Sequence, residues 1–230
     1  MEPTNPWLSQ ITNKPLREQV LDALRDAIIQ GDLRPGQPLI ETELAAQLGV
    51  SRAPLREALQ ILNSEGLLET IPYHGTTVRR LTRMNIEELY SLRSVLEAFA
   101  VRRIIACAEP VDVERLKLHF EAMLAMAERG DLRGLNEEDR AFHDTLIELS
   151  RHSLLMSTWN MVALRVRQVM ALLNERNTQL RQIALNHLPI IEAISDGDEE
   201  RAVALIEKHI AATGELIAEG WDDDESEGTW

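Results

Sequence analysis

The chain has 230 residues, of which 44% are hydrophobic and 27% are charged, a composition typical of a globular protein with one or two domains. It contains no run of about 18 apolar residues, and residues 1–7 lack the basic and then apolar pattern of a secretory signal. These observations argue against a membrane-spanning helix and predict a cytoplasmic protein. The single cysteine, Cys107, cannot form an internal disulfide, and its helical surroundings predict a buried packing thiol.

The net charge of −14 is concentrated in the second part of the chain. Residues 1–83 contain 9 Lys and Arg and 10 Asp and Glu, and subtraction from the 24 and 38 of the whole chain leaves 15 and 28 for residues 84–230. Five of the last ten residues are acidic, which favours a disordered tail over 220–230. The contrast predicts two electrostatically different modules, the first nearly neutral.

Three helices are predicted in the first module. Apolar residues at positions 16, 20, 24, 27 and 28 recur at helical spacing and predict a helix over 16–30. A second helix is expected over about 41–48, because Gly49 can adopt the left-handed conformation that ends a helix. Ser51 is a suitable N-cap for a third helix, which should run to about residue 65. The short second helix, tight turn and third helix form a helix-turn-helix pattern.

Two arginines near the start of the third helix are candidate DNA contacts. Arg52 and Arg56 lie four residues apart, so they share a helix face that is separate from the apolar stripe. The first turns of a recognition helix enter the major groove, where arginine binds guanine O6 and N7 in a bidentate manner. On an isolated helix both would more simply be solvated arginines, but the helix-turn-helix pattern favours base contacts.

A β-hairpin is predicted directly after the third helix. Two short β-like runs, 68–71 and 76–80, are separated by Pro72, Tyr73, His74 and Gly75, with glycine at the turn. This hairpin would be the wing of a winged helix-turn-helix. His74 and the backbone of Gly75 could reach the minor groove or the phosphates, although His74 could equally be an exposed turn residue.

Residues 31–78 resemble the GntR family of bacterial regulators, because the turn, both helices and the wing occur in order at family spacing. The resemblance implies that Arg52 and Arg56 read bases and that His74 and Gly75 form the tip of the wing. Some family members carry a further DNA-contacting arginine at the positions of residues 41–43. This chain has Glu, Thr and Glu there, so we expect that contact to be missing.

The second module is predicted to be an antiparallel bundle of six helices. Asn85 and Glu88 make a capping box, and helical patterns follow over about 85–108, 111–129, 136–150, 153–175, 178–194 and 198–219. The expected fold is therefore mainly α, with the winged helix-turn-helix in residues 1–80, a linker in 81–84, a helical domain in 85–219 and the acidic tail in 220–230.

Four residues of the second module form a candidate metal site. Asp139 and His143 are four apart and share one helix face. If the last hairpin turns between Asp196 and Gly197, His187 and His209 are offset by only about 4–5 Å along antiparallel helices at about 1.5 Å per residue, so they can meet. Pro189, two residues after His187, should kink or break that helix and could displace the ligand.

A carboxylate and three imidazoles are a ligand set suited to Zn²⁺, Ni²⁺ or similar divalent ions. Each histidine considered alone would more simply be a satisfied core or surface residue, and only the combination favours a metal. The other two histidines in this module, His119 and His152, have no partner at helical or hairpin spacing. For these two we expect a structural role.

Residues 85–215 resemble the FCD type of effector domain of the GntR family, in its shorter six-helix variant. The resemblance implies that Asp139, His143, His187 and His209 are metal ligands and that Arg93 faces an effector pocket. Many members have a Gly-Asn pair after the third helix of the domain, where this chain has Arg151 and His152. That difference could alter the turn without affecting a ligand.

Together these features predict a homodimeric transcription regulator that binds a pseudo-palindromic DNA operator, and repression is favoured over activation. A small organic acid or sugar acid, bound at or beside the metal with help from Arg93, would weaken DNA binding. One alternative is a metal-dependent hydrolase that uses the Asp and His cluster, but no general base is recognisable beside it. Another is an architectural DNA-binding protein with an inert bundle.

Overall fold

The computed structural model describes residues 14–71, 75–107, 110–173 and 179–221. The chain divides into two compact units, one comprising residues 1–28 and 32–79 and the other residues 29–31 and 80–230. Among the described helices, none combines the length and the apolar character that crossing a bilayer would require.

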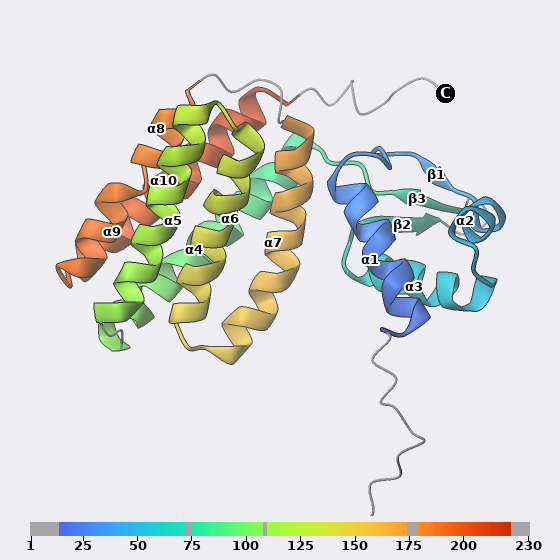
Figure 1. Ribbon diagram of the computed structural model, residues 1–230, viewed down its shortest axis with the longest axis horizontal. Coiled ribbons are helices and arrows are strands. Elements are labelled where there is room, and N and C mark those ends of the chain that lie inside the picture. The colour runs from blue at the N-terminus through green and yellow to red at the C-terminus, as the bar shows by residue number, and fades with distance from the viewer. Residues whose placement is uncertain (1–13, 72–74, 108–109, 174–178, 222–230) are drawn as a thin grey trace, which may run out of the picture. The chain divides into compact units, whose positions relative to one another are not determined.

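The first unit contains three helices and a small antiparallel sheet (Figure 1). Its elements in chain order are α1 (Leu16–Ile29), β1 (Pro38–Leu39), α2 (Glu41–Leu48), α3 (Arg52–Ser64), β2 (Leu68–Ile71) and β3 (Gly75–Val78). The strand order is β1-β3-β2, with Leu68 opposite Val78 and Leu39 opposite Thr76. The predicted winged helix-turn-helix is confirmed, while β1 was not predicted because two residues carry no periodic signal.

Local sequence explains the helix-turn-helix geometry. Gly49 has a left-handed φ of 65° and ends α2, and Ser51 is the N-cap of α3 in an extended conformation, as predicted. The apolar stripe of α3 is buried in full, with Leu55, Ala58 and Leu62 at 0% exposure. This burial leaves the opposite face of α3 to the solvent.

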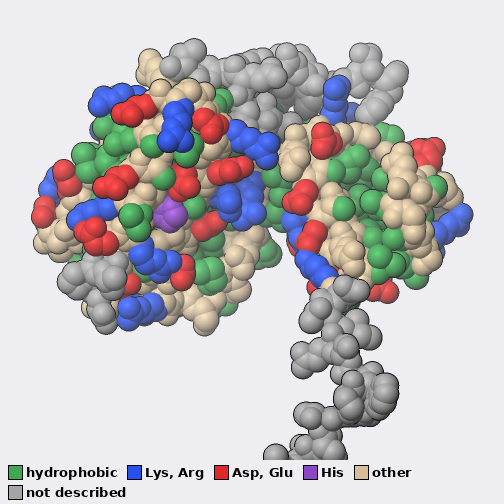
Figure 2. All heavy atoms as spheres, viewed as in Figure 1, with side chains coloured by type: hydrophobic (Ala, Val, Ile, Leu, Met, Phe, Trp, Pro, Cys, Tyr) green, Lys and Arg blue, Asp and Glu red, His purple; other side chains and the backbone are tan. Residues whose placement is uncertain are grey.

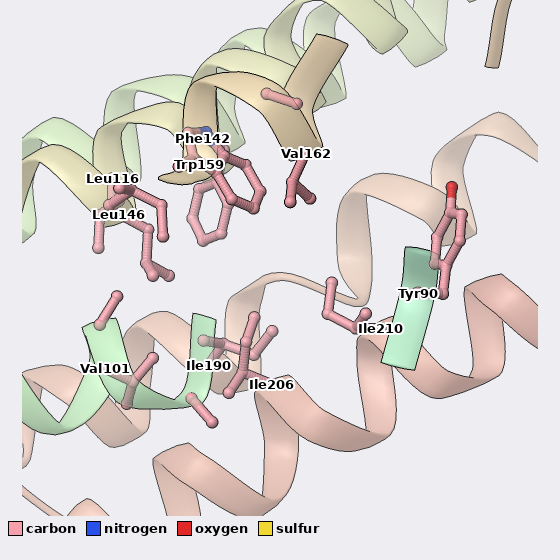
Figure 3. Packing of buried hydrophobic residues seen from close by; sticks show 14 of the residues in the cluster. Tyr90, Val101, Leu116, Phe142, Leu146, Trp159, Val162, Ile190, Ile206 and Ile210 are labelled. Atoms are coloured by element: carbon pink, nitrogen blue, oxygen red, sulfur yellow. The ribbon is translucent and has the colours of Figure 1, made fainter. Parts of the chain in front are cut away.

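The second unit is a helical bundle (Figure 1). It consists of α4 (Arg83–Cys107), α5 (Pro110–Arg129), α6 (Leu132–Leu149), α7 (Ser153–Leu173), α8 (Leu180–Leu185), α9 (Leu188–Ser195) and α10 (Glu199–Glu219). Figure 3 shows apolar side chains from several of these helices facing one another in a continuous core. Phe142 and Leu146 of α6 contribute to it, together with Trp159 of α7 and Ile206 of α10.

Several predicted boundaries of the bundle were wrong. The helix expected over 178–194 is two helices, so the described bundle has seven segments rather than six. The break predicted at Pro189 is confirmed: Pro189 lies in the first turn of α9, where its missing N–H needs no partner, so a new helix begins there. The N-cap of α6 is Asp131, which accepts a hydrogen bond from the Gly134 N–H, so this helix begins four residues earlier than predicted.

The start of α4 also differs from the prediction. Thr82 Oγ1 accepts from the Asn85 N–H and Asn85 Oδ1 accepts from the Thr82 N–H, both at 3.2 Å. The reciprocal cap therefore involves Thr82 and Asn85 rather than Asn85 and Glu88, and the helix begins at Arg83, inside the predicted linker 81–84. Cys107, predicted to be buried, is exposed because it is the last residue of α4.

The predicted acidic tail begins with two ordered residues. Gly220 caps α10, and the Trp221 indole donates to the Leu81 carbonyl at 3.0 Å within the same unit. Residues 222–230, which contain the acidic side chains, lie outside the described residues.

Candidate metal centre and nucleic-acid interface

The four predicted ligands converge in the helical unit. Asp139 and His143 lie on one face of α6, His187 lies at the junction between α8 and α9, and His209 lies on α10. Each offers a ligand atom, and these atoms all lie within 4.8 Å of one another. The α9–α10 hairpin turns at Gly197, whose φ is 71°, and brings the rings of His187 and His209 to a centroid distance of 4.5 Å.

Nε2 of His187 is the centre of the closest contacts in the cluster. It lies 3.2 Å from Oδ1 of Asp139 and 3.5 Å from Nε2 of His143. The rings of His143 and His209 are nearly parallel, at an angle of 20° and 5.4 Å between centroids. Phe142, which is fully buried, packs edge-on against the rings of His143 and His187, so an apolar wall closes one side of the site.

The remaining ring nitrogens of two ligands are held by acceptors. Nδ1 of His187 donates to the carbonyl oxygen of Ile183 at 3.0 Å, and Nδ1 of His143 donates to Oε2 of Glu97 at 2.5 Å. Because a carbonyl and an ionised carboxylate only accept, Nδ1 is the protonated nitrogen and each Nε2 faces the cluster. Metal-binding histidines are oriented in this way by a carbonyl or carboxylate on the second nitrogen.

Burial keeps His143 and His209 in the form that binds metals. Desolvation lowers the pKa of His143, although Glu97 opposes this effect, and it lowers the pKa of His209 well below its ordinary value. Burial alone would raise the pKa of Asp139, but the adjacent His187, together with His143 and Arg93, holds that pKa far below its usual range. At neutral pH Asp139 is therefore a carboxylate, and His143 and His209 are neutral imidazoles.

The donor set fits a divalent ion. Two Nε2 lone pairs that face each other at 3.5 Å cannot hydrogen-bond to one another, whereas both can bind a cation. Ligand atoms at about 2.1 Å from a shared ion lie at most about 4.2 Å apart, close to the 4.8 Å that spans this cluster. Asp139 and the three histidines could therefore hold such an ion with little rearrangement.

Arg93, the predicted effector contact, lies buried beside this cluster. It is only 4% exposed, and its Nε donates to Oε1 of Glu97 at 2.6 Å. The guanidinium carbon lies 5.5 Å from the ring centroid of Tyr90 and 5.9 Å from that of Trp159, distances typical of cation–π contacts. Two aromatic rings and one carboxylate thus fix a buried cation.

Glu97 was missed by sequence reasoning. It is completely buried and bridges Arg93 and His143. Burial favours its neutral form, but the adjacent His143 and Arg93 outweigh that effect and lower the pKa of Glu97 to about 2. The available signal was its spacing of four residues from Arg93, which puts both on one face of α4.

The two histidines outside the predicted ligand set have local partners. His119 contacts Oε2 of Glu138 at 2.9 Å and Oγ1 of Thr145 at 3.1 Å, which ties α5 to α6. Nδ1 of His152 accepts from the Leu155 N–H at the start of α7. Arg151 adopts a left-handed φ of 52°, which costs some strain in a residue other than glycine.

The DNA-facing candidates lie on the first unit. Arg52 and Arg56 are both exposed on α3, and Nε of Arg56 donates to Oε2 of Glu41 at 2.8 Å. Gly75 begins β3 with a φ of 95°, and His74 lies outside the described residues. Figure 2 shows acidic and basic side chains interspersed over the visible face of each unit.

Comparison with known families decides the classification. Residues 16–78 match the model of the bacterial regulatory proteins of the gntR family, and residues 88–212 match the model of the FCD domain. The chain belongs to the GntR family. It is a transcriptional regulator, and its GntR-type helix-turn-helix implies DNA binding.

Individual GntR relatives support this assignment over most of their length. The chain is 34% identical over 203 residues to the "Probable D-xylose utilization operon transcriptional repressor" of Paenarthrobacter nicotinovorans, covering 88% of this chain and 89% of the relative. It is 29% identical over 226 residues to the gluconate operon transcriptional repressor of Bacillus subtilis, covering 94% and 89%. These names indicate regulators rather than enzymes, so the hydrolase alternative is not supported.

A solved structure shares the fold. E. coli McbR/YncC superposes with a TM-score of 0.77 at 25% identity, covering 91% of this chain and all of that chain.

Proposed function

We propose that this GntR regulator is a repressor whose operator affinity is lowered by a small carboxylate bound at a divalent metal ion in the helical unit. The observation that carries the proposal is the convergence of Asp139, His143, His187 and His209 to within 4.8 Å, next to the buried cation Arg93. A metal-bound anion site would require both the four converging residues and this cation.

The charges of the site explain why an acid would need the metal. Asp139 and Glu97 are ionised and Arg93 is positive, so with neutral imidazoles the group has a net charge of about −1. A bound divalent ion would supply two positive charges and open coordination positions. The group would then carry about +1 and attract a carboxylate in a partly apolar bundle.

Arg93 would orient the acid. Its Nε is committed to Glu97, so a carboxylate would bind to Arg93 through the Nη groups. The rings of Tyr90 and Trp159, whose centroids lie 5.5 and 5.9 Å from the guanidinium carbon, would limit its movement. Gluconate, named in the relative from Bacillus subtilis, is a sugar acid, so a sugar acid or organic acid is the effector class that we propose.

On the DNA side, we propose that Arg52 and Arg56 read bases and that the wing beginning at Gly75, with His74, contacts the minor groove or phosphates. A homodimer would place two such units on a pseudo-palindromic operator. Arg93 and Glu97 lie on α4, the first helix after the DNA-binding unit. Acid binding at these residues would thereby bias the two operator-binding units.

The test measures the metal content of the purified protein and then its response to acids. The purified protein should contain about one divalent ion per chain, and His187→Ala should lose it and unfold at a lower temperature, because a ligand bound only by the folded state stabilises that state. His119→Ala is the matched control, since His119 contacts Glu138 and Thr145 instead of the cluster, and it should keep the ion.

The metal-loaded protein should also be stabilised by sugar acids and release DNA selected from a random pool. The ion-free protein should respond to neither. Full metal content in His187→Ala, or an equal acid response without metal, would contradict the proposal.

A further inference from the structure

Glu97 occupies a position that neither the ligand set nor the acid-binding arginine explains by itself. It is 0% exposed, and each of its carboxylate oxygens serves a different functional group. Oε1 accepts from Nε of Arg93 at 2.6 Å, and Oε2 accepts from Nδ1 of His143 at 2.5 Å. One buried side chain therefore joins the helix α4 that carries the arginine to the helix α6 that carries the metal ligand.

Both of these bonds need an acceptor. The Nε of an arginine is always a donor, and Nδ1 of His143 must be a donor if Nε2 is to bind a metal. A carboxylate supplies two acceptor oxygens, whereas the isosteric amide of glutamine supplies one acceptor and one donor. With glutamine at this position, one partner would face an N–H, and His143 could relieve the conflict only by moving its proton to Nε2.

We propose that Glu97 is a positioning residue that fixes the tautomer of His143 while it holds Arg93, so that metal binding and acid binding depend on one shared carboxylate. This inference rests on the proposed function. It adds that the acid-binding arginine and the metal ligand cannot be altered independently. When Nε2 of His143 donates its lone pair to a cation, its Nδ1–H becomes a stronger donor to Glu97, and Arg93 is then less fully neutralised.

The test compares Zn²⁺ affinity and histidine tautomers in wild type, Glu97→Gln and a control. Loss of an outer hydrogen-bond partner of a ligand weakens metal binding by about 10- to 100-fold, which we expect for Glu97→Gln. Nitrogen-15 NMR of the metal-free proteins should show Nδ1-protonated His143 in wild type and Nε2-protonated His143 in the variant. Glu138→Gln also removes a carboxylate from a histidine, His119, and should change the Zn²⁺ affinity by less than about threefold.

A second pair of variants separates hydrogen bonding from charge and covers the case that Glu97→Gln does not fold with an unpaired Arg93. In an Arg93→Met background, the single carbonyl of a glutamine at position 97 is free to accept from His143. There, Glu97→Gln should cost less than about threefold in Zn²⁺ affinity and leave Nδ1 protonated. A loss above tenfold in that background would show that Glu97 acts through its charge and would overturn the inference.

The failure of the inference is distinguishable from that of the proposed function. Wild type that binds no Zn²⁺ refutes both. Wild type that binds Zn²⁺ together with a Glu97→Gln variant of equal affinity and unchanged His143 tautomer refutes the role of Glu97 alone.

Discussion

Arg56, which we propose reads a base, is already paired in the free protein. Its Nε lies 2.8 Å from Oε2 of Glu41, with side-chain exposures of 60% and 37%. An ion pair this exposed contributes about 0.2–1 kcal/mol, and Arg56 must give it up to bind guanine. Glu41→Gln should therefore tighten operator binding by up to about fivefold, whereas Arg56→Ala should weaken it by about 1–3 kcal/mol.

The assay is a fluorescence anisotropy titration of an operator selected from random DNA, at low and at high salt. Glu43→Gln is the control, because Glu43 is an exposed carboxylate of the same helix with no ion pair among the described residues. The Glu43→Gln variant reports the general effect on operator affinity of removing one negative charge near DNA. That general effect should decrease at high salt. The gain from Glu41→Gln beyond that of Glu43→Gln should vanish in an Arg56→Ala background. An equal gain in operator affinity with and without Arg56 would refute the idea that Glu41 and the DNA compete for Arg56.

Two further predictions concern the helical unit. Gly214→Ala should destabilise it by about 1–2 kcal/mol, because the added Cβ would lie 2.6 Å from Cβ of Tyr90 and overpacking outweighs the gain in helix propensity. The control is Gly220→Ala at the C-cap of the same helix, where an added Cβ meets only atoms at 3.6 Å or more. Equal melting temperatures of the two variants would contradict the argument. The metal-free protein should lose stability as the pH falls from 7.5 to 5.5, because burial lowers the pKa of His143 and of His209. The unfolded chain then takes up protons below about pH 6.5 that the folded chain does not, and urea unfolding that is constant over this range would contradict it.

The sequence was sufficient for the architecture because its signals were local. Glycine and serine at the ends of α2 and α3 stop and start those helices, and helical periodicity located most of the bundle. The predicted proximity of His187 and His209 is confirmed, because their offset along the hairpin depends mainly on the turn near Gly197 and on the rise per residue. Convergence of the four ligands was thus predictable from spacing.

The prediction errors arose where the local sequence is compatible with more than one structure or where a role depends on a distant residue. The region 178–194 is apolar enough for one helix, and Pro189 predicted a kink or a break within it. The backbone shows that Asn186 is the C-cap of α8 and that His187 is the N-cap of α9. The break does not displace the ligand, because Nδ1 of His187 is tied to the Ile183 carbonyl of the preceding turn. Glu97 could not be assigned for a different reason, since its function depends on His143, 46 residues away in the chain.

The positions of the site residues on the helices indicate how acid binding could affect DNA binding. Asp139, His143, His187 and His209 all lie on α6 or later elements, so metal binding alone would stabilise the bundle as a unit. Arg93 and Glu97 lie on α4, whose first residue, Arg83, follows the DNA-binding unit by only three residues. An acid that bridges the metal and Arg93 would add a direct link between α4 and the metal, beyond the bond that Glu97 already makes to His143. We therefore expect the metal to determine whether the acid binds, and the acid to determine whether the operator is released.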